Sequence, residues 1–273
     1  HLLVDSKTTW PVSLLRYDYQ YPYDNWHGSS PIGTLINEGT LTAQRMEMNL
    51  SCYPHLWLFF TPPFDMKAAD LTCNNLRTPF VLRTFDGAQR AAGNHYRVWQ
   101  DVSSDATLQA GRGYILQYGS YGYQRGYEDW TTSGTTDDIE FHLQGYVPVQ
   151  APGLSSQAVS VPLTEYKSDY PHNEGWNLVG NPFMAYYDIR YMESDAPVLV
   201  AGGNGNRTFT AYSPLDDELV LYPLQAFLTQ RSQQQTAVTF TPEGRHQRHR
   251  APLHPEQCTL VAPCPAAPAA RAL

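Results

Sequence analysis

The sequence WNLVGNPF at residues 176–183 decides the fold, because the chain contains a second version of it. Residues 57–64 read WLFFTPPF, so a tryptophan, a proline and a phenylalanine recur at an offset of 183 − 64 = 119 residues. In both versions β-prone residues precede a proline, a pattern that predicts a strand running into a tight turn. A repeat at this spacing predicts that the chain folds as two similar structural units.

Further landmarks follow this pair along the chain. Four residues recur at an offset of 113, namely Trp99, Leu108, Tyr114 and Gln117 against Tyr212, Leu221, Phe227 and Gln230. Each unit then closes on another strand-like segment, residues 139–145 in the first unit and residues 237–244 in the second. Phe141 and Phe240 in these closing segments are only 99 residues apart. This drop from the offset of 113 indicates that the first unit carries an insertion, residues 118–138, between its last two strands.

Short strands account for most of the remaining pattern. Apolar and polar residues alternate at every second position in four segments: residues 41–52, 106–117, 156–163 and 217–230. The segment GGNGN, residues 202–206, predicts a hairpin, whereas residues 66–71 and 186–192 each predict one helical turn. We therefore predict an all-β protein whose two homologous units form a β-sandwich or a barrel-like architecture with few short helical turns.

These signals divide the chain into four parts. Residues 1–40 form an N-terminal β segment, residues 41–150 the first unit, residues 151–245 the second unit, and residues 246–273 a disordered tail rich in proline and alanine. In the N-terminal segment Tyr17, Tyr19, Tyr21 and Tyr23 alternate. This alternation predicts four rings on one strand face, either packed across a sheet or available for stacking on sugars.

Composition excludes several classes of protein. The chain has 273 residues, 42% of them hydrophobic, and its 18 basic and 26 acidic residues give a net charge of −8. This acidic balance argues against a nucleic-acid partner, and the longest apolar stretch, residues 56–60, is too short to span a membrane. The four cysteines lack the spacing of a zinc or redox motif. Cys52 and Cys73 could form a disulfide, but two free thiols are the favoured alternative.

The residues GWNLVGNPFMAYYDI (175–189), together with residues 211–230 and 240–245, resemble a known module. The chain is similar to the duplicated β module, of the WNLVGNP type, from the C-terminal regions of large secreted or surface proteins of Bacteroidetes, some of which carry leucine-rich repeats. Residues 57–71, 85–94 and 105–117 resemble its companion copy. The resemblance implies an extracellular or cell-surface location, on the exterior of the outer membrane, and supplies no catalytic residues.

Catalytic and metal-binding patterns are sparse, so we expect no catalytic residues, no metal and no cofactor. The acidic runs at residues 137–140 and 216–218 could bind calcium or supply a hydrolase acid and base, but adjacent acids in turns are usually solvated. His246, His249 and His254 lie in the predicted tail, which offers no scaffold for a metal. In WNLVGNPF, we expect Gly180 and Asn181 to adopt backbone conformations that bulky residues avoid.

The insertion in the first unit is the candidate ligand-binding site. Glycines separate aromatic rings that could stack on sugars, and charged side chains beside them could bind hydroxyl groups. The candidate residues are Tyr118, Tyr121, Tyr123, Arg125, Tyr127, Glu128 and Trp130. Two alternatives are a mobile loop and a hairpin that folds its own aromatic side chains inward.

These observations predict a noncatalytic extracytoplasmic surface module with an interaction or architectural role. Its expected partners are glycans or proteins of a host or cell surface, as in adhesion and carbohydrate binding. A glycan-directed hydrolase is the first alternative, and it requires two carboxylates that converge on a cleft. A pure spacer or sorting-associated domain is the second alternative, and it requires no binding site.

Overall fold

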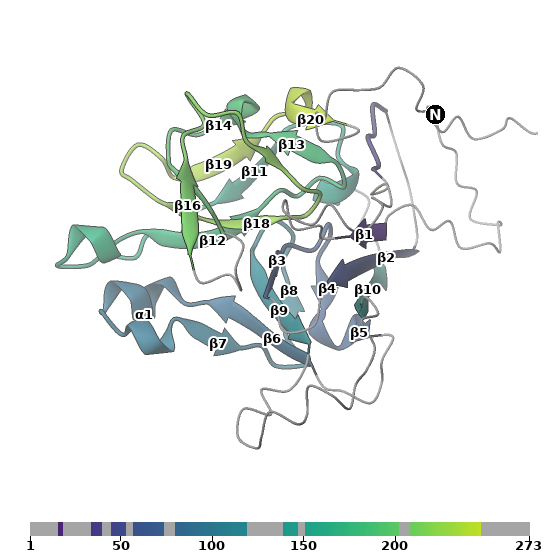
Figure 1. The fold of residues 1–273 in the computed structure, drawn as a ribbon, viewed down its shortest axis with the longest axis horizontal. Helices are drawn as coiled ribbons and strands as arrows, with labels where there is room; N and C mark the ends of the chain where they lie inside the picture. The colour runs from purple at the N-terminus through teal and green to yellow at the C-terminus, as the bar shows by residue number, and fades with distance from the viewer. Residues whose placement is uncertain are drawn as a thin grey trace, which may run out of the picture.

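Strands form most of the computed structural model (Figure 1), which describes residues 16–18, 34–39, 45–52, 57–73, 80–118, 139–146, 151–201 and 208–246. Within these ranges the only α-helix is α1, Gly87–Ala91. The prediction of an all-β protein is therefore confirmed. The N-terminal tyrosine stripe is described only as the backbone of β1, Arg16–Asp18, and the tail after residue 246 lies outside the described ranges.

Three sheets contain the strands up to residue 150. One has the order β1-β2-β10-β5, a second the order β3-β9-β6-β7, and a third contains β4 and β8. The strands not yet located are β2 (Arg45–Cys52), β3 (Leu58–Phe60), β4 (Met66–Lys67), β5 (Leu71–Cys73), β6 (Phe80–Phe85), β7 (Trp99–Asp101), β8 (Thr107–Leu108), β9 (Tyr114–Tyr118) and β10 (Ile139–Tyr146).

Three further sheets contain the strands after residue 150. Their orders are β12-β18-β15-β16, β11-β19-β14 and β17-β13-β20. Their strands are β11 (Val159–Pro162), β12 (Trp176–Gly180), β13 (Tyr186–Asp188), β14 (Met192–Glu193), β15 (Val198–Ala201), β16 (Phe209–Tyr212), β17 (Val220–Leu221), β18 (Ala226–Gln230), β19 (Ala237–Phe240) and β20 (Arg245–His246). None of the six sheets of described strands closes on itself.

The strand orders of the two halves correspond. The order β3-β9-β6-β7 matches β12-β18-β15-β16, the order β2-β10-β5 matches β11-β19-β14, and β4-β8 matches β13-β17. Single 3-10 turns, η1 (Ala68–Asp70) and η5 (Ile189–Tyr191), follow β4 and β13. These turns confirm the predicted helical turns in the two segments.

The two central sheets, β3-β9-β6-β7 and β12-β18-β15-β16, pack against each other in the middle of the molecule. Along β3, Leu58 and Phe60 enter the apolar core of the first half, whereas Phe59 points to a third cluster that also contains Leu178 and Leu228. Along β18, Phe227 enters the core of the second half. Because neighbouring side chains of a strand point to opposite faces, both faces of these strands are buried.

Reciprocal contacts join the two halves at this junction. Phe60 forms an isolated antiparallel bridge with Gln225, and Val179 forms one with Arg112. The two bridges are equivalent, because Phe60 and Val179 are related by the sequence offset of 119, and Arg112 and Gln225 by the offset of 113. Two hydrogen bonds repeat this relation. The amide of Thr61 donates to the carbonyl of Leu224 at 2.9 Å, and the amide of Gly180 to that of Gly111 at 3.0 Å.

The repeated motif differs from its prediction at Gly180 and Asn181. Neither has a positive φ, because the described residues with positive φ are Gly93, Gly111, Gly175 and Leu224. A side chain at position 180 would instead collide with Thr61, whose Cγ2 lies 2.7 Å from the place of a Cβ atom. Close approach between the two halves, rather than backbone conformation, therefore requires glycine there.

The two tryptophans of the motif are half-buried, whereas the paired Phe64 and Phe183 are completely buried. Trp57 and Trp176 both pack at the edge of the third cluster. They therefore occupy similar environments at the rim of the junction, although the motif alone suggests full burial.

The strand register shows whether Cys52 and Cys73 can form a disulfide. Cys52 pairs with Ile139 on one side of β10, and Cys73 pairs with Phe141 on the other side. Strands that flank a third strand lie about 9.5 Å apart, whereas the Cα atoms of a disulfide lie within about 7 Å of each other. These two cysteines therefore cannot form a disulfide in this fold.

Candidate functional site

The candidate site of the sequence analysis lies almost entirely outside the described residues. Only Tyr118, at the end of β9, has a described backbone, whereas Tyr121, Tyr123, Arg125, Tyr127, Glu128 and Trp130 fall within residues 119–138. These residues connect β9 to β10, and the matching connection between β18 and β19 consists only of residues 231–236. The structure thus locates the two ends of the insertion.

The acidic run at residues 216–218 forms a turn. The Asp217 carboxylate accepts a hydrogen bond from the Ser213 amide at 2.6 Å, and the Asp216 carboxylate accepts one from the Ser213 hydroxyl. Glu218 instead forms an ion pair with Arg190 at 2.9 Å. Each of the three carboxylates therefore has a structural partner in the protein, Ser213 for the two aspartates and Arg190 for Glu218. In the other acidic run only the backbone of Glu140 is described.

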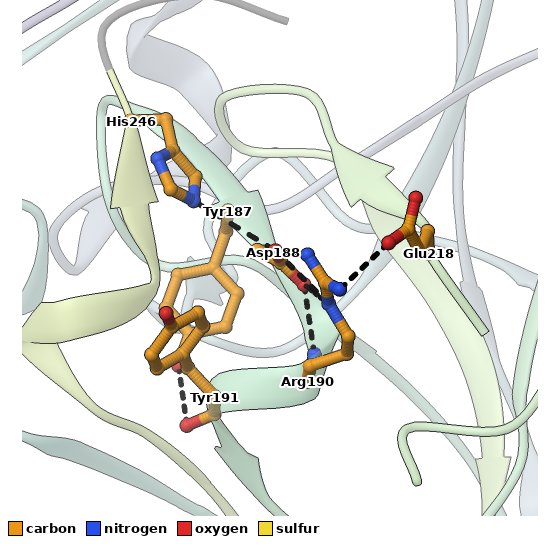
Figure 2. Close-up of polar contacts among 6 residues, drawn as sticks. All are labelled: Tyr187, Asp188, Arg190, Tyr191, Glu218 and His246. Carbon is orange, nitrogen blue, oxygen red and sulfur yellow. Dashed lines mark hydrogen bonds and ion pairs between the residues drawn. The ribbon is translucent and has the colours of Figure 1, made fainter. Parts of the chain in front are cut away.

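Figure 2 shows the polar cluster in which Glu218 takes part, beside β13. The Asp188 carboxylate, with only 5% of its side chain exposed, accepts hydrogen bonds from the Arg190 amide, Nε and Nη2. His246 Nε2 lies 4.0 Å from the same carboxylate. His246 belongs to β20 and pairs with Tyr186, so the structure places it in a sheet and not at the start of the tail.

The electrostatics of this cluster commit Asp188 to the ionised form. Burial alone would raise the pKa of Asp188, but the hydrogen bonds and charge of Arg190, aided by His246, outweigh burial and lower the pKa. The neighbouring Tyr187 hydroxyl donates to the Tyr191 carbonyl and accepts from the Thr241 amide, and burial raises the pKa of Tyr187. Neither group is poised to exchange a proton with a substrate.

The amide side chains of WNLVGNPF have structural partners. Asn181 is completely buried, and its Nδ2 donates to the carbonyls of Ala185 and Tyr222 while its Oδ1 accepts from the Phe183 amide. Asn177 binds the backbone of Thr164 in the same way. These bonds confirm the structural interpretation of the motif.

The sequence analysis missed a group of exposed tyrosines. Tyr96 is fully exposed in the 3-10 turn η2, His95–Arg97, and Tyr170 is 61% exposed just before the turn η4, Pro171–Asn173. The Tyr170 ring lies 6.0 Å from the His172 ring. Tyr191, in η5, is also exposed. No periodic pattern marks these residues, because each lies in an irregular connection.

Two general features concern metals and membranes. The described residues contain no group of three or more His, Cys, Asp or Glu side chains arranged to hold a metal ion. None of the described helices has the length and apolar character needed to cross a membrane.

Comparison of the chain with protein-family models, with curated proteins and with solved structures found no match. The function is therefore argued from the residues of this chain.

Proposed function

We propose that the chain is a noncatalytic extracytoplasmic surface module built from two copies of one β unit, each a two-sheet sandwich. In this proposal, the insertion of residues 118–138 in the first copy recognises glycans or glycoproteins. The observation that carries the proposal is the difference between two matching connections, residues 119–138 after β9 and residues 231–236 after β18.

The proposal of two copies is supported by the shared strand orders and by the reciprocal bridges at the junction. Phe60 pairs with Gln225 in one bridge, and their counterparts Val179 and Arg112 pair with each other in the second bridge. Such reciprocal pairing is expected where two like units pack around an approximate two-fold axis. The apolar clusters on the outer faces of the two central sheets support a sandwich in each copy.

A recognition role for the insertion follows from what the copies share. Both copies contain the strands that folding requires, so a long addition to one copy alone is available for another purpose. Its aromatic residues offer flat apolar faces for sugar rings. The noncatalytic proposal is supported by the described carboxylates of the second copy, since Asp188, Asp216 and Asp217 are engaged by neighbouring protein groups.

The experiment compares the parent protein with a variant in which Tyr123, Tyr127 and Trp130 are changed to alanine. Both proteins are applied to a glycan array and to columns of immobilised glycoprotein. We expect the variant to lose retention while its melting temperature stays unchanged. The matched control is Tyr191→Ala, which removes an exposed ring from the second copy.

Two results would contradict the proposal. If the triple variant unfolds, its aromatic rings belong to the core. If the parent protein binds no glycan or glycoprotein on a broad panel, the spacer alternative takes its place.

A further inference from the structure

The two copies differ at a second place, where two loops meet at one corner of the molecule. The connection between β6 and β7 consists of residues 86–98, whereas its counterpart between β15 and β16 consists of residues 202–208. The connection between β11 and β12 consists of residues 163–175, whereas its counterpart between β2 and β3 consists of residues 53–57. One loop is therefore extended in each copy.

The two extended loops lie side by side. In Figure 1 they project from the same end of the molecule, α1 below and the segment before β12 above it. The Ser168 hydroxyl in one loop donates to the Ala91 carbonyl in the other at 2.6 Å. Gly87 lies against the ring of Tyr166, which leaves no room for a side chain at position 87. An approximate two-fold axis between the two copies explains this pairing. It brings the connection between β6 and β7 of the first copy next to the connection between β11 and β12 of the second copy.

Both loops are held in place by hydrogen bonds. Asp86 caps α1 by accepting from the amides of Ala88 and Gln89 at 2.9 and 3.1 Å. In the other loop, Gln230 Nε2 donates to the carbonyls of Pro171 and Glu174, and Trp176 Nε1 donates to the carbonyl of His172 at 2.8 Å. The loops are therefore ordered by bonds that do not involve their exposed side chains.

Each loop presents a tyrosine beside a charged group. The fully exposed Tyr96 precedes Arg97, and the exposed Tyr170 follows Asp169. Among the described residues, neither the Arg97 guanidinium nor the Asp169 carboxylate has a hydrogen-bond or ion-pair partner, although the backbone of Arg97 bonds to Asn94 and Gln100. The corner thus combines two ring faces with a guanidinium that donates hydrogen bonds and a carboxylate that accepts them.

We propose that this corner, formed by Tyr96, Arg97, Asp169 and Tyr170, is a binding site for neutral oligosaccharides. Sugar rings have an apolar face that stacks on tyrosine and an edge of hydroxyl groups that both donate and accept hydrogen bonds. The two loops together carry nearly balanced charge, so the corner does not strongly favour an anionic or a cationic ligand. Their acidic residues are Asp86, Glu165, Asp169 and Glu174, and their basic residues are Arg90, Arg97 and Lys167. This inference rests on the proposed two copies and on the proposed glycan-binding function, and it adds a site remote in sequence from the insertion.

The experiment uses affinity electrophoresis of the whole chain in gels that contain one soluble polysaccharide each. The neutral probes are dextran, galactomannan and xyloglucan, and the acidic probe is alginate. We expect the double variant Tyr96→Ala/Tyr170→Ala to bind a neutral probe about fivefold or more weakly than the parent, since it removes two aromatic stacking contacts. Its melting temperature should not change, because both rings are exposed.

Two further variants separate stacking from other effects. The variant Tyr96→Phe/Tyr170→Phe keeps both rings and should retain most of the affinity. Tyr191→Ala removes an exposed ring outside the corner and should bind as the parent does. If the double alanine variant binds every neutral probe as strongly as the parent, or if Tyr191→Ala weakens binding equally, the inference is wrong.

The triple variant of the insertion distinguishes this inference from the proposed function. If only the insertion variant loses binding to neutral probes, the corner is not a site and the proposed function stands. If the parent binds alginate alone, the corner is again excluded while glycan binding remains. If the corner variant alone loses binding, the corner is the site and the role of the insertion is excluded. A parent that binds none of the probes contradicts the corner site.

Discussion

Gly111 and Leu224 occupy matching positions at the junction, and both have a left-handed backbone, with φ of 80° and 59°. For a residue with a Cβ atom this conformation costs about 1–2 kcal/mol. Leu224 nevertheless remains almost completely buried in the core of the first half. The burial of its side chain, worth about 1.5–3 kcal/mol, offsets the strain. The junction therefore tolerates a strained leucine in one half where the other has glycine.

Gly111→Ala tests the packing around this backbone. We expect it to lower the free energy of unfolding by roughly 2–4 kcal/mol, because the left-handed φ adds to a collision with Val161 Cγ2, 2.6 Å from the added Cβ. The matched control is Gly93→Ala, whose φ is 78° but whose Cβ would meet no atom within 4 Å. The control should lose only about 1–2 kcal/mol. Equal losses in urea denaturation would show that the contact with Val161 contributes nothing.

Asp188 provides a pH-dependent contribution to stability. Its pKa is lowered in the folded protein, so the ionised carboxylate stabilises the fold above the ordinary Asp pKa, and this stabilisation is lost as the pH falls through the folded pKa. Arg190→Leu leaves the buried carboxylate without its main donors. We expect a loss of roughly 1–3 kcal/mol at pH 7, the cost of an unpaired buried acceptor.

The pH dependence distinguishes this effect from lost packing. Removing Arg190 leaves burial to raise the pKa of Asp188 in the variant, so the difference between Arg190→Leu and the parent should shrink as the pH falls from this raised pKa toward the lowered pKa of the parent. Thermal unfolding at a series of pH values measures it. A difference that stays constant down to pH 2 would mean that the charge of Asp188 is irrelevant.

At the scale of elements, the two central sheets are held close by small residues. A Cβ atom at Gly113, before β9, would collide with Leu178 of β12 and lie 3.1 Å from Ala226 Cβ of β18. The Gly113 amide also donates to the Leu178 carbonyl at 3.0 Å. The spacing of the sheets therefore depends on the absence of a side chain at position 113.

A double-mutant cycle tests this spacing. Gly113→Ala should destabilise by about 1–3 kcal/mol through overpacking, and Leu178→Ala should cost about 2–5 kcal/mol through the cavity that it leaves. The double variant should lose less than the sum, because the new methyl group occupies part of the space that Leu178 vacates. Simple additivity in urea denaturation would indicate that the sheets move apart instead.

Strands could be predicted from the sequence better than sites could. The motif WNLVGNPF and the alternating segments identify β12, β18 and β11, since period-two patterns are local. The polar cluster could not be predicted, because Arg190 meets Glu218, and Asp188 meets His246, only after three segments have paired. The corner likewise joins Ala91 to Ser168. The difference in loop length between the two halves of the chain was the available signal for it.

At the scale of the whole molecule, the cores of the two halves are not independent. Met184 and Leu224 of the second half are buried in the core of the first half. The third apolar cluster draws Phe59 and Ile115 from the first half and Leu178 from the second. Neither central sheet can bury both of its faces without the other half. This arrangement couples the folding of the two halves.

The coupling predicts a single cooperative unfolding transition. In calorimetry the measured enthalpy should equal the van't Hoff enthalpy of one two-state unit. Phe240→Ala empties a completely buried position in the core of the second half, at a cost of about 3–5 kcal/mol. Because the first half loses its partner sheet when the second unfolds, this variant should shift the whole transition to lower temperature. Two transitions, of which only one shifts in Phe240→Ala, would show instead that each half completes its own core.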